Sequence, residues 1–156
     1  METQVRISEQ MPVGESTGVD VPGQLWKRYH MEKASIEANL NTTVEMGMSH
    51  TEGTSQNLFT YFAGGLVQNI PDRLQDGFVK RELSAGEYIV CRVEAENFED
   101  LVTVALDQAS KYLFGIWLPR HNLTTEPFSA EKYYRDAEDM AYMEIWVKPL
   151  PLKNKS

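Results

Sequence analysis

Residues 97–119 read NFEDLVTVALDQASKYLFGIWLP, and they predict the clearest helix of the chain. Asn97 is expected to be the N-cap, with Asp100 three residues later as a capping-box variant. Pro119 is expected to end the helix shortly after Trp117. Apolar residues recur at steps of three and four, as in a helix with one buried face; they are Phe98, Leu101, Val102, Ala105, Ala109, Tyr112, Leu113 and Ile116.

A second helix is predicted over residues 24–40, where Leu25, Tyr29, Ile36 and Leu40 form one stripe and Trp26 lies beside it. Elsewhere the apolar period is two, which predicts strands. The predicted strands cover residues 44–49, 58–67, 78–94, 128–134 and 142–148, with a bulge or turn at residues 84–86 and an end to pairing at Pro149 and Pro151.

The predicted elements follow the order strand, helix, strand, strand, and then repeat it. This order predicts an α+β fold in which duplicated strand-helix-strand-strand units form one mostly antiparallel sheet, with two helices on one face. A split ferredoxin-like domain with extra strands has similar elements and stays open. A chain of 156 residues is one domain by length, and we expect its core over about residues 21–150.

Charge and composition narrow the classes of partner. Fifteen Lys and Arg against 23 Asp and Glu give a net charge of −8. Such a surface repels phosphate backbones and anionic lipids, so we expect no direct nucleic acid and no membrane partner, and a cation is favoured. The single cysteine and the absence of a secretory signal or a long apolar stretch predict a cytoplasmic protein.

Strand alternation places aromatic side chains beside carboxylates. In the last strand, Met143, Ile145 and Val147 form an apolar side suited to covering helices, while Tyr142, Glu144 and Trp146 form the opposite side. In the strand before it, Glu131 and Tyr133 share a side, opposite Lys132 and Tyr134, and we expect both carboxylates on a face that the helices need not cover. Rings and a desolvated carboxylate together suit an organic cation. An ordinary solvent-facing side of a sheet is the alternative.

Other chemistries find less support. The histidines His30, His50 and His121 lack the spacing of metal ligands, and Gly64-Gly65 lacks the lysine and helix of a phosphate loop. Cys91 lies among aliphatic residues in a predicted strand, where a buried, unreactive thiol is expected. We therefore expect no metal and no cofactor. A carboxylate with a raised pKa could still support acid–base hydrolysis.

Five blocks occur in a telling order: FTYFAGGLV (59–67), LSAGEYIVCRVE (83–94), GIWLPRH (115–121), AEKYY (130–134) and MEIWVKPL (143–150). Together they resemble the effector-binding domain shared by gyrase-inhibitor-like proteins and AraC-type, multidrug-responsive transcription activators, over about residues 21–149. The resemblance implies the fold described above, with a ligand groove on the sheet between its halves. It also implies amphipathic, often cationic, aromatic ligands bound against a central glutamate.

Carried over block by block, the resemblance implies that Glu131 is the central acid and Glu144 a second pocket carboxylate. Tyr88 matches the aromatic residue after the Ala-Gly turn, and Trp26 matches the aromatic residue that opens the first helix. These four residues are expected to converge on one groove. The remaining ligand-binding candidates are Tyr61 in its strand block, Met46 in the preceding strand and Trp146, which alternates with Glu144.

The expected function is that of a stand-alone binding protein for amphipathic aromatic cations, acting as a sensor or a sequestering module linked to transcription regulation or resistance. Only about 20 residues precede the first predicted helix, so we expect no DNA-binding domain. Two alternatives stay open: a hydrolase of electrophilic drug-like molecules that uses Glu131, and a gyrase-inhibitor-like module that binds a partner protein. A homodimer or a regulatory protein partner also stays open.

Overall fold

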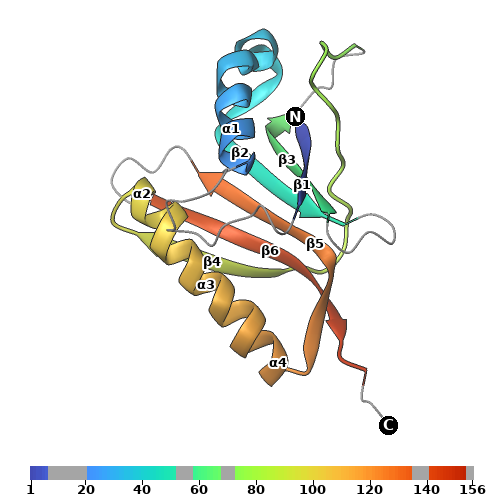
Figure 1. Ribbon diagram of the computed structural model, residues 1–156, viewed down its shortest axis with the longest axis vertical. Coiled ribbons are helices and arrows are strands. Elements are labelled where there is room, and N and C mark those ends of the chain that lie inside the picture. The colour runs from blue at the N-terminus through green and yellow to red at the C-terminus, as the bar shows by residue number, and fades with distance from the viewer. Residues whose placement is uncertain (7–20, 52–57, 68–72, 135–140, 154–156) are drawn as a thin grey trace.

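The computed structural model describes residues 1–6, 21–51, 58–67, 73–134 and 141–153 and contains one six-stranded sheet (Figure 1). The strands follow the order β1-β3-β2-β5-β6-β4, and every neighbouring pair is antiparallel. Their bounds are β1 (Glu2–Arg6), β2 (Leu40–His50), β3 (Leu58–Val67), β4 (Ile89–Ala95), β5 (Leu123–Tyr134) and β6 (Ala141–Pro151). The predicted α+β class is confirmed.

Two helical stretches lie on the same side of this sheet (Figure 1). Helix α1 (Val21–Glu32) covers the half made of β1 and β3 and continues into a 3₁₀ turn, η2 (Lys33–Asn39). The second stretch, residues 98–120, is here named the long helix and covers the half made of β4 and β6. It consists of α2 (Phe98–Asp100), η3 (Leu101–Ala105), α3 (Leu106–Tyr112), η4 (Leu113–Trp117) and α4 (Leu118–Arg120).

The two halves of the sheet have matching strand orders. From one edge inward the order is β1, β3, β2, and from the other edge inward it is β4, β6, β5. Each half thus starts with the strand that comes first in the sequence, followed by the third and then by the second. No repeat of sequence accompanies this order, so a duplication of one unit stays an interpretation of it.

The predicted cap of the long helix is confirmed. Asn97 has extended backbone angles, and its side-chain oxygen accepts a hydrogen bond of 2.8 Å from the Asp100 backbone N–H. The Asp100 carboxylate in turn accepts a 2.9 Å bond from the Asn97 amide. The helix runs to Arg120, past the predicted end, and Asn122 follows it with a φ of 55°. A residue in this left-handed conformation commonly terminates a helix.

We expect Asn97→Ala to lower the free energy of unfolding by about 1 kcal/mol, because it leaves the Asp100 N–H without its acceptor. For a domain of this size, that corresponds to about 2–4 °C in melting temperature. Thermal unfolding followed by circular dichroism measures the loss. Asn97→Asp keeps a capping oxygen and should melt close to wild type; equal melting of wild type and Asn97→Ala would contradict the capping role.

Helix α1 is shorter than the helix predicted over residues 24–40, because it ends at Glu32. The Ser35 hydroxyl donates a 3.1 Å hydrogen bond to the Glu32 carbonyl oxygen. Serine side chains compete in this way with regular helical hydrogen bonds. The predicted apolar stripe is nevertheless correct within α1, since Leu25 and Tyr29 are buried.

Two apolar clusters hold the helices to the sheet. Under the long helix, the buried residues are Val93, Leu101, Leu113, Leu118, Met143, Ile145 and Val147. Under α1, they are Met1, Leu25, Tyr29, Tyr61 and Ala63. The predicted apolar side of the last strand, with Met143, Ile145 and Val147, therefore faces a helix as expected.

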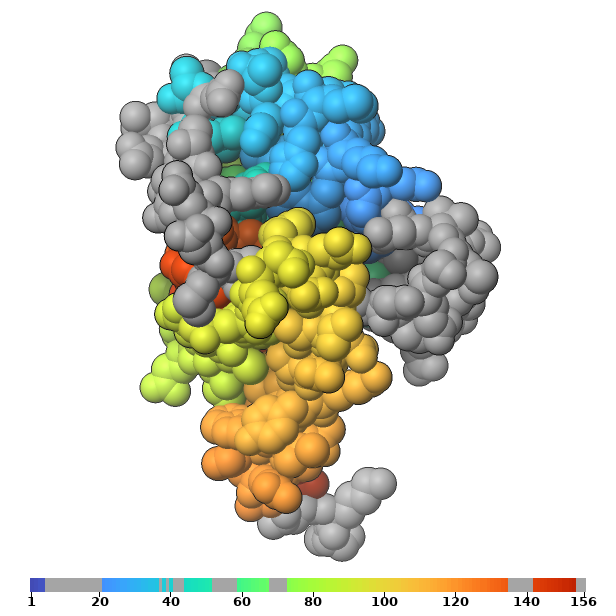
Figure 2. Space-filling model, turned by 90° about the vertical axis from the view of Figure 1, so that its left-hand side faces the viewer, coloured from blue at the N-terminus to red at the C-terminus, as the bar shows by residue number. Residues whose placement is uncertain are grey.

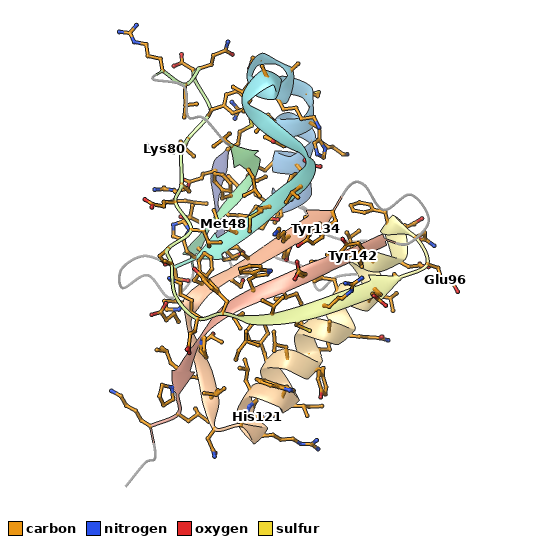
Figure 3. All side chains as sticks on the ribbon, turned by 180° about the vertical axis from the view of Figure 1, so that it is seen from behind. Met48, Lys80, Glu96, His121, Tyr134 and Tyr142 are labelled. Carbon is orange, nitrogen blue, oxygen red and sulfur yellow. The ribbon has the colours of Figure 1, made fainter. Side chains whose placement is uncertain are left out.

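The opposite side of the sheet, here named the helix-free face, has a third cluster that contains Val44, Met46, Met48, Phe62 and Ala130. The strand predicted over residues 78–94 is wrong in its first part, because β4 begins only at Ile89. Residues 73–88 instead run past the sheet without pairing to it (Figure 3), and Leu83 packs against the third cluster.

Pairing does not end at Pro149, contrary to the prediction. Pro149 lies opposite Thr125, and Pro151 lies opposite Leu123. The register between β5 and β6 shifts between Thr125 and Ser129, and a proline is tolerated next to such an irregularity because not every strand residue donates to the ladder.

Candidate functional site

Five side chains from four elements meet where α1 and the long helix come together over the sheet. They are Trp26 on α1, Tyr61 on β3, Phe98 at the start of the long helix, and Glu131 and Tyr133 on β5. We name them the aromatic–acid cluster. In the space-filling view, the surface of α1 in blue meets the start of the long helix in yellow (Figure 2).

Ring contacts and hydrogen bonds connect the cluster. The Trp26 and Tyr133 rings lie 5.9 Å apart in an edge-to-face arrangement, and the Phe98 and Tyr133 rings lie 6.3 Å apart. The Trp26 indole nitrogen donates a 2.9 Å hydrogen bond to the Tyr61 hydroxyl. Phe98 is 48% exposed whereas Tyr61 is 5% exposed, so the cluster extends from solvent to the surface of the sheet.

Gly47 on β2 makes the close approach of Tyr61 possible. It lies directly opposite Glu131 on one neighbouring strand and Ala63 on the other. A Cβ atom at this position would lie 2.3 Å from the Tyr61 hydroxyl oxygen and 3.5 Å from Glu131 Oε2. The absence of a side chain therefore lets Tyr61 and Glu131 approach each other above the backbone of β2.

Glu131 is a partly buried acid whose surroundings are mainly aromatic. The Tyr133 hydroxyl donates a 2.5 Å hydrogen bond to Glu131 Oε2. Among the residues that the structure describes, no lysine, arginine or histidine forms an ion pair with Glu131. Burial raises the pKa of Glu131 above its ordinary value, and the hydrogen bond from Tyr133 opposes this shift only in part.

A second acid lies behind the cluster but has a partner. Glu45 on β2 is 5% exposed, and its Oε2 lies 2.6 Å from His30 Nε2. The His30 ring lies 5.5 Å from that of Trp26. Burial, together with the charge of Glu45, raises the pKa of the neighbouring Tyr29 to about 12. Glu131 thus differs from Glu45, because it has no ion-pair partner among the described residues.

The raised pKa of Glu131 predicts how stability depends on pH. Above its ordinary pKa of 4.5, the folded protein retains a proton that the unfolded chain has lost, so stability falls as pH rises. Because glutamine does not ionise, Glu131→Gln removes this fall in stability with rising pH. The glutamine side chain can still accept the Tyr133 hydrogen bond. We expect the variant to be more stable than wild type at pH 7.

Thermal melts of both proteins between pH 4 and pH 8 measure this effect. The difference in melting temperature should shrink as the pH falls through 4.5, because the unfolded chain then takes up the same proton. A variant that is less stable than wild type at pH 7 would contradict a desolvated carboxylate at this position.

The structure divides the seven predicted ligand-binding residues between the two faces of the sheet. Glu131, Trp26 and Tyr61 lie together on the helix side, as described above. The other four lie on the helix-free face: Met46, Tyr88, Glu144 and Trp146. The expectation that Glu131, Glu144, Tyr88 and Trp26 converge on one groove is therefore not met.

The reason is the register between the last two strands. Glu131 lies directly opposite Ile145, and Glu144 lies directly opposite Lys132. Residues directly opposite each other point to the same face. Because Ile145 packs under the long helix, Glu131 faces the helices and Glu144 faces away from them. The expectation that Glu131 lies on a face free of helices is therefore wrong, whereas Glu144 does lie on such a face.

Each of the four displaced residues has local partners. The Tyr134 hydroxyl donates a hydrogen bond to Glu144, and the Tyr88 and Trp146 rings lie 5.3 Å apart. Met46 is 6% exposed in the third cluster. Ligand binding by any of the seven residues stays a prediction.

Three members of the site were not predicted as such, although two had a signal. Tyr133 shares the side of Glu131 by alternation, and Gly47 is a glycine inside a strand, which often marks a close approach. Phe98 fits the apolar stripe of the long helix, so nothing in the sequence separates it from the core residues.

A comparison with known protein families identifies the family of this chain. A family model described as the GyrI-like small molecule binding domain matches residues 5–149. The chain belongs to this family. As a GyrI-like domain, it has a small-molecule-binding role, which confirms the coarse functional prediction. A search of curated proteins finds no match to the chain.

Two negative findings concern this GyrI-like domain. Among the described residues, no group of three or more His, Cys, Asp and Glu side chains is arranged to hold a metal ion. The helices of the described segments are too short or too polar to cross a membrane.

Proposed function

We propose that this GyrI-like domain binds an amphipathic aromatic cation at the aromatic–acid cluster. The observation that carries the proposal is Glu131, an acid set among rings with no cationic partner among the described residues. A carboxylate in such a place is costly unless a positive charge joins it. An organic cation with a ring system supplies that charge and covers the apolar surroundings.

Each side chain then has a distinct role. Glu131 compensates the ligand charge, while Trp26 and Tyr133 offer ring surface, since a cation is attracted to the faces of aromatic rings. Tyr61 is fixed by its hydrogen bond from Trp26 and orients that indole. Phe98 is half-exposed and supplies the outer apolar contact.

Binding of a cation should also remove the proton from Glu131. Burial favours the protonated form of Glu131, whereas a positive ligand favours the ionised form. Affinity therefore increases with pH until Glu131 is fully ionised. The ligand contacts both α1 and the long helix, so occupancy stabilises their mutual packing, which suits a sensor or a sequestering module.

N-Methylquinolinium and its neutral isostere 1-methylnaphthalene test the proposal. We expect the cation to bind at least tenfold more tightly than the neutral compound at pH 8, with a smaller ratio at pH 5, because charge compensation needs the ionised carboxylate. Calorimetry or tryptophan fluorescence measures the affinities. Equal affinities for the two compounds at every pH would refute a charge-selective site.

A second candidate function is hydrolysis of an electrophilic aromatic compound. It is favoured by one observation: a carboxyl group with a raised pKa stands beside a phenol, as in general acid–base sites. Glu131 would then accept a proton from an attacking water. Turnover of such a compound that Glu131→Gln abolishes would favour this function over binding alone.

A further inference from the structure

The helix-free face contains a lysine, Lys132, that has no acidic partner among the described residues. Lys132 on β5 is partly buried, and the structure gives its ammonium two neighbours, both of them rings. Its Nζ atom lies 5.1 Å from the centroid of Tyr134 and 5.4 Å from that of Trp146. Glu144 lies directly opposite on β6, but its carboxylate accepts a hydrogen bond from Tyr134 and forms no ion pair with Lys132.

The same face contains a buried donor with no acceptor. Trp146 Nε1 is the one buried side-chain nitrogen or oxygen of the described residues that lacks a hydrogen-bond partner. An indole N–H is a donor only, so it needs an oxygen acceptor from outside the described side chains. A buried donor without a hydrogen bond destabilises the folded protein, so native structures contain few of them.

The Lys132 ammonium and the Trp146 indole N–H belong to the neighbouring strands β5 and β6. Both lie at the Trp146 ring, because the ammonium is 5.4 Å from its centroid. Trp146 lies opposite Ala130, two residues before Lys132 on β5, and Ala130 is fully buried and small. The Tyr88 ring lies 5.3 Å from the Trp146 ring on the other side. Figure 3 views this face and shows Tyr134 beside Tyr142 at the end of β5 and β6.

We propose that the helix-free face has a second binding site, which takes an aromatic carboxylate. The carboxylate is held between the Lys132 ammonium and the Trp146 indole N–H, and the ring of the ligand packs against Tyr88 and Trp146. The ligand supplies two partners that the described residues do not provide: an ion-pair partner for Lys132 and an acceptor for Trp146. Since Lys132 has a flexible stem, the carboxylate can enter without a backbone change.

Charges of both signs surround this position, with Glu144 directly opposite Lys132. Lys148 also lies over the Tyr88 ring, at 5.6 Å; it donates a hydrogen bond to the Ser84 hydroxyl and lies 3.7 Å from Glu126. Arg92 lies 4.3 Å over the Tyr142 ring and forms an ion pair of 2.8 Å with Glu94. The site therefore differs in sign from the aromatic–acid cluster on the other side of the sheet, and it does not depend on the proposed function of that cluster.

Titration with 2-naphthoate, followed by ¹H–¹⁵N spectra of the three tryptophan indoles, tests the second site. We expect the Trp146 signal, assigned with Trp146→Phe, to shift while the Trp26 signal stays in place. Lys132→Gln should weaken 2-naphthoate at least about tenfold, as expected when a charged hydrogen bond is lost. Trp146→Phe keeps a ring but loses the donor and should weaken it several-fold.

Controls make the outcome decisive. Lys111→Gln removes an exposed lysine of the long helix, paired with Asp107, and should leave 2-naphthoate affinity unchanged. The neutral compound 2-methylnaphthalene should leave the Trp146 N–H signal in place. An unshifted Trp146 signal, equal affinity in Lys132→Gln and wild type, or a shift confined to Trp26 would each overturn the proposal.

Discussion

Glu131→Gln should weaken the binding of N-methylquinolinium about 100-fold at pH 8. Glutamine keeps the size of the side chain and the acceptor for the Tyr133 hydroxyl, but it removes the charge. The loss corresponds to about 2.7 kcal/mol, within the range for removing one member of a desolvated ion pair. Calorimetric titration of both proteins measures it.

The stability of Glu131→Gln shows whether weaker binding could result from partial unfolding of the variant. We expect Glu131→Gln to be more stable than wild type at pH 7, because burial raises the pKa of Glu131. Weaker binding by a more stable protein cannot come from partial unfolding. Gain of stability with loss of binding is the usual pattern for a strained functional site.

Glu144→Gln is the matched control. It makes the same change in the acid that the sequence assigned to the same pocket, but which faces away from the helices. N-Methylquinolinium affinity should stay within about twofold of wild type. A loss as large as that of Glu131→Gln would mean that the cation binds on the helix-free face instead.

Gly47→Ala should lower the free energy of unfolding by about 1–3 kcal/mol, the usual cost of overpacking. The new methyl carbon would lie 2.3 Å from the Tyr61 hydroxyl oxygen, so Tyr61 has to move and its hydrogen bond from Trp26 is lost. Because Trp26 is then no longer fixed, N-methylquinolinium affinity should also fall about tenfold. Thermal melts and fluorescence titration measure the two effects.

Gly115→Ala is the control for the same change of residue. A Cβ atom at Gly115 in the long helix would meet nothing within 4 Å. Alanine in a helix is more favourable than glycine by about 0.5–1 kcal/mol, so this variant should be more stable than wild type. Destabilisation of similar size at both glycines would argue against the close contact between Gly47 and Tyr61.

Most of the fold could be predicted from the spacing of apolar residues and from the residue that caps the long helix. The long helix follows from its apolar stripe and from Asn97, whose side chain caps it as expected. The alternation of Met143, Ile145 and Val147 also identified the side of β6 that meets the helices. Element boundaries were less accurate, because Ser35 and the irregular segment before Ile89 depend on local hydrogen bonds and on tertiary cover.

The site could be predicted only in part, because it depends on register between strands. Alternation correctly separates Glu131 and Tyr133 from Lys132 and Tyr134 within β5. It does not say whether Glu131 lies opposite Ile145 or opposite Glu144, and a shift of one residue reverses the face. Contacts across elements, such as that between Trp26 and Tyr61, are likewise absent from any pattern within one segment.

A crystal structure of the domain with N-methylquinolinium tests the central claim most directly. We expect the ligand at the aromatic–acid cluster, with its charged ring beside the Glu131 carboxylate and in contact with Trp26 and Tyr133. Ligand density on the helix-free face over Trp146 and Tyr88, with the aromatic–acid cluster empty, would contradict it.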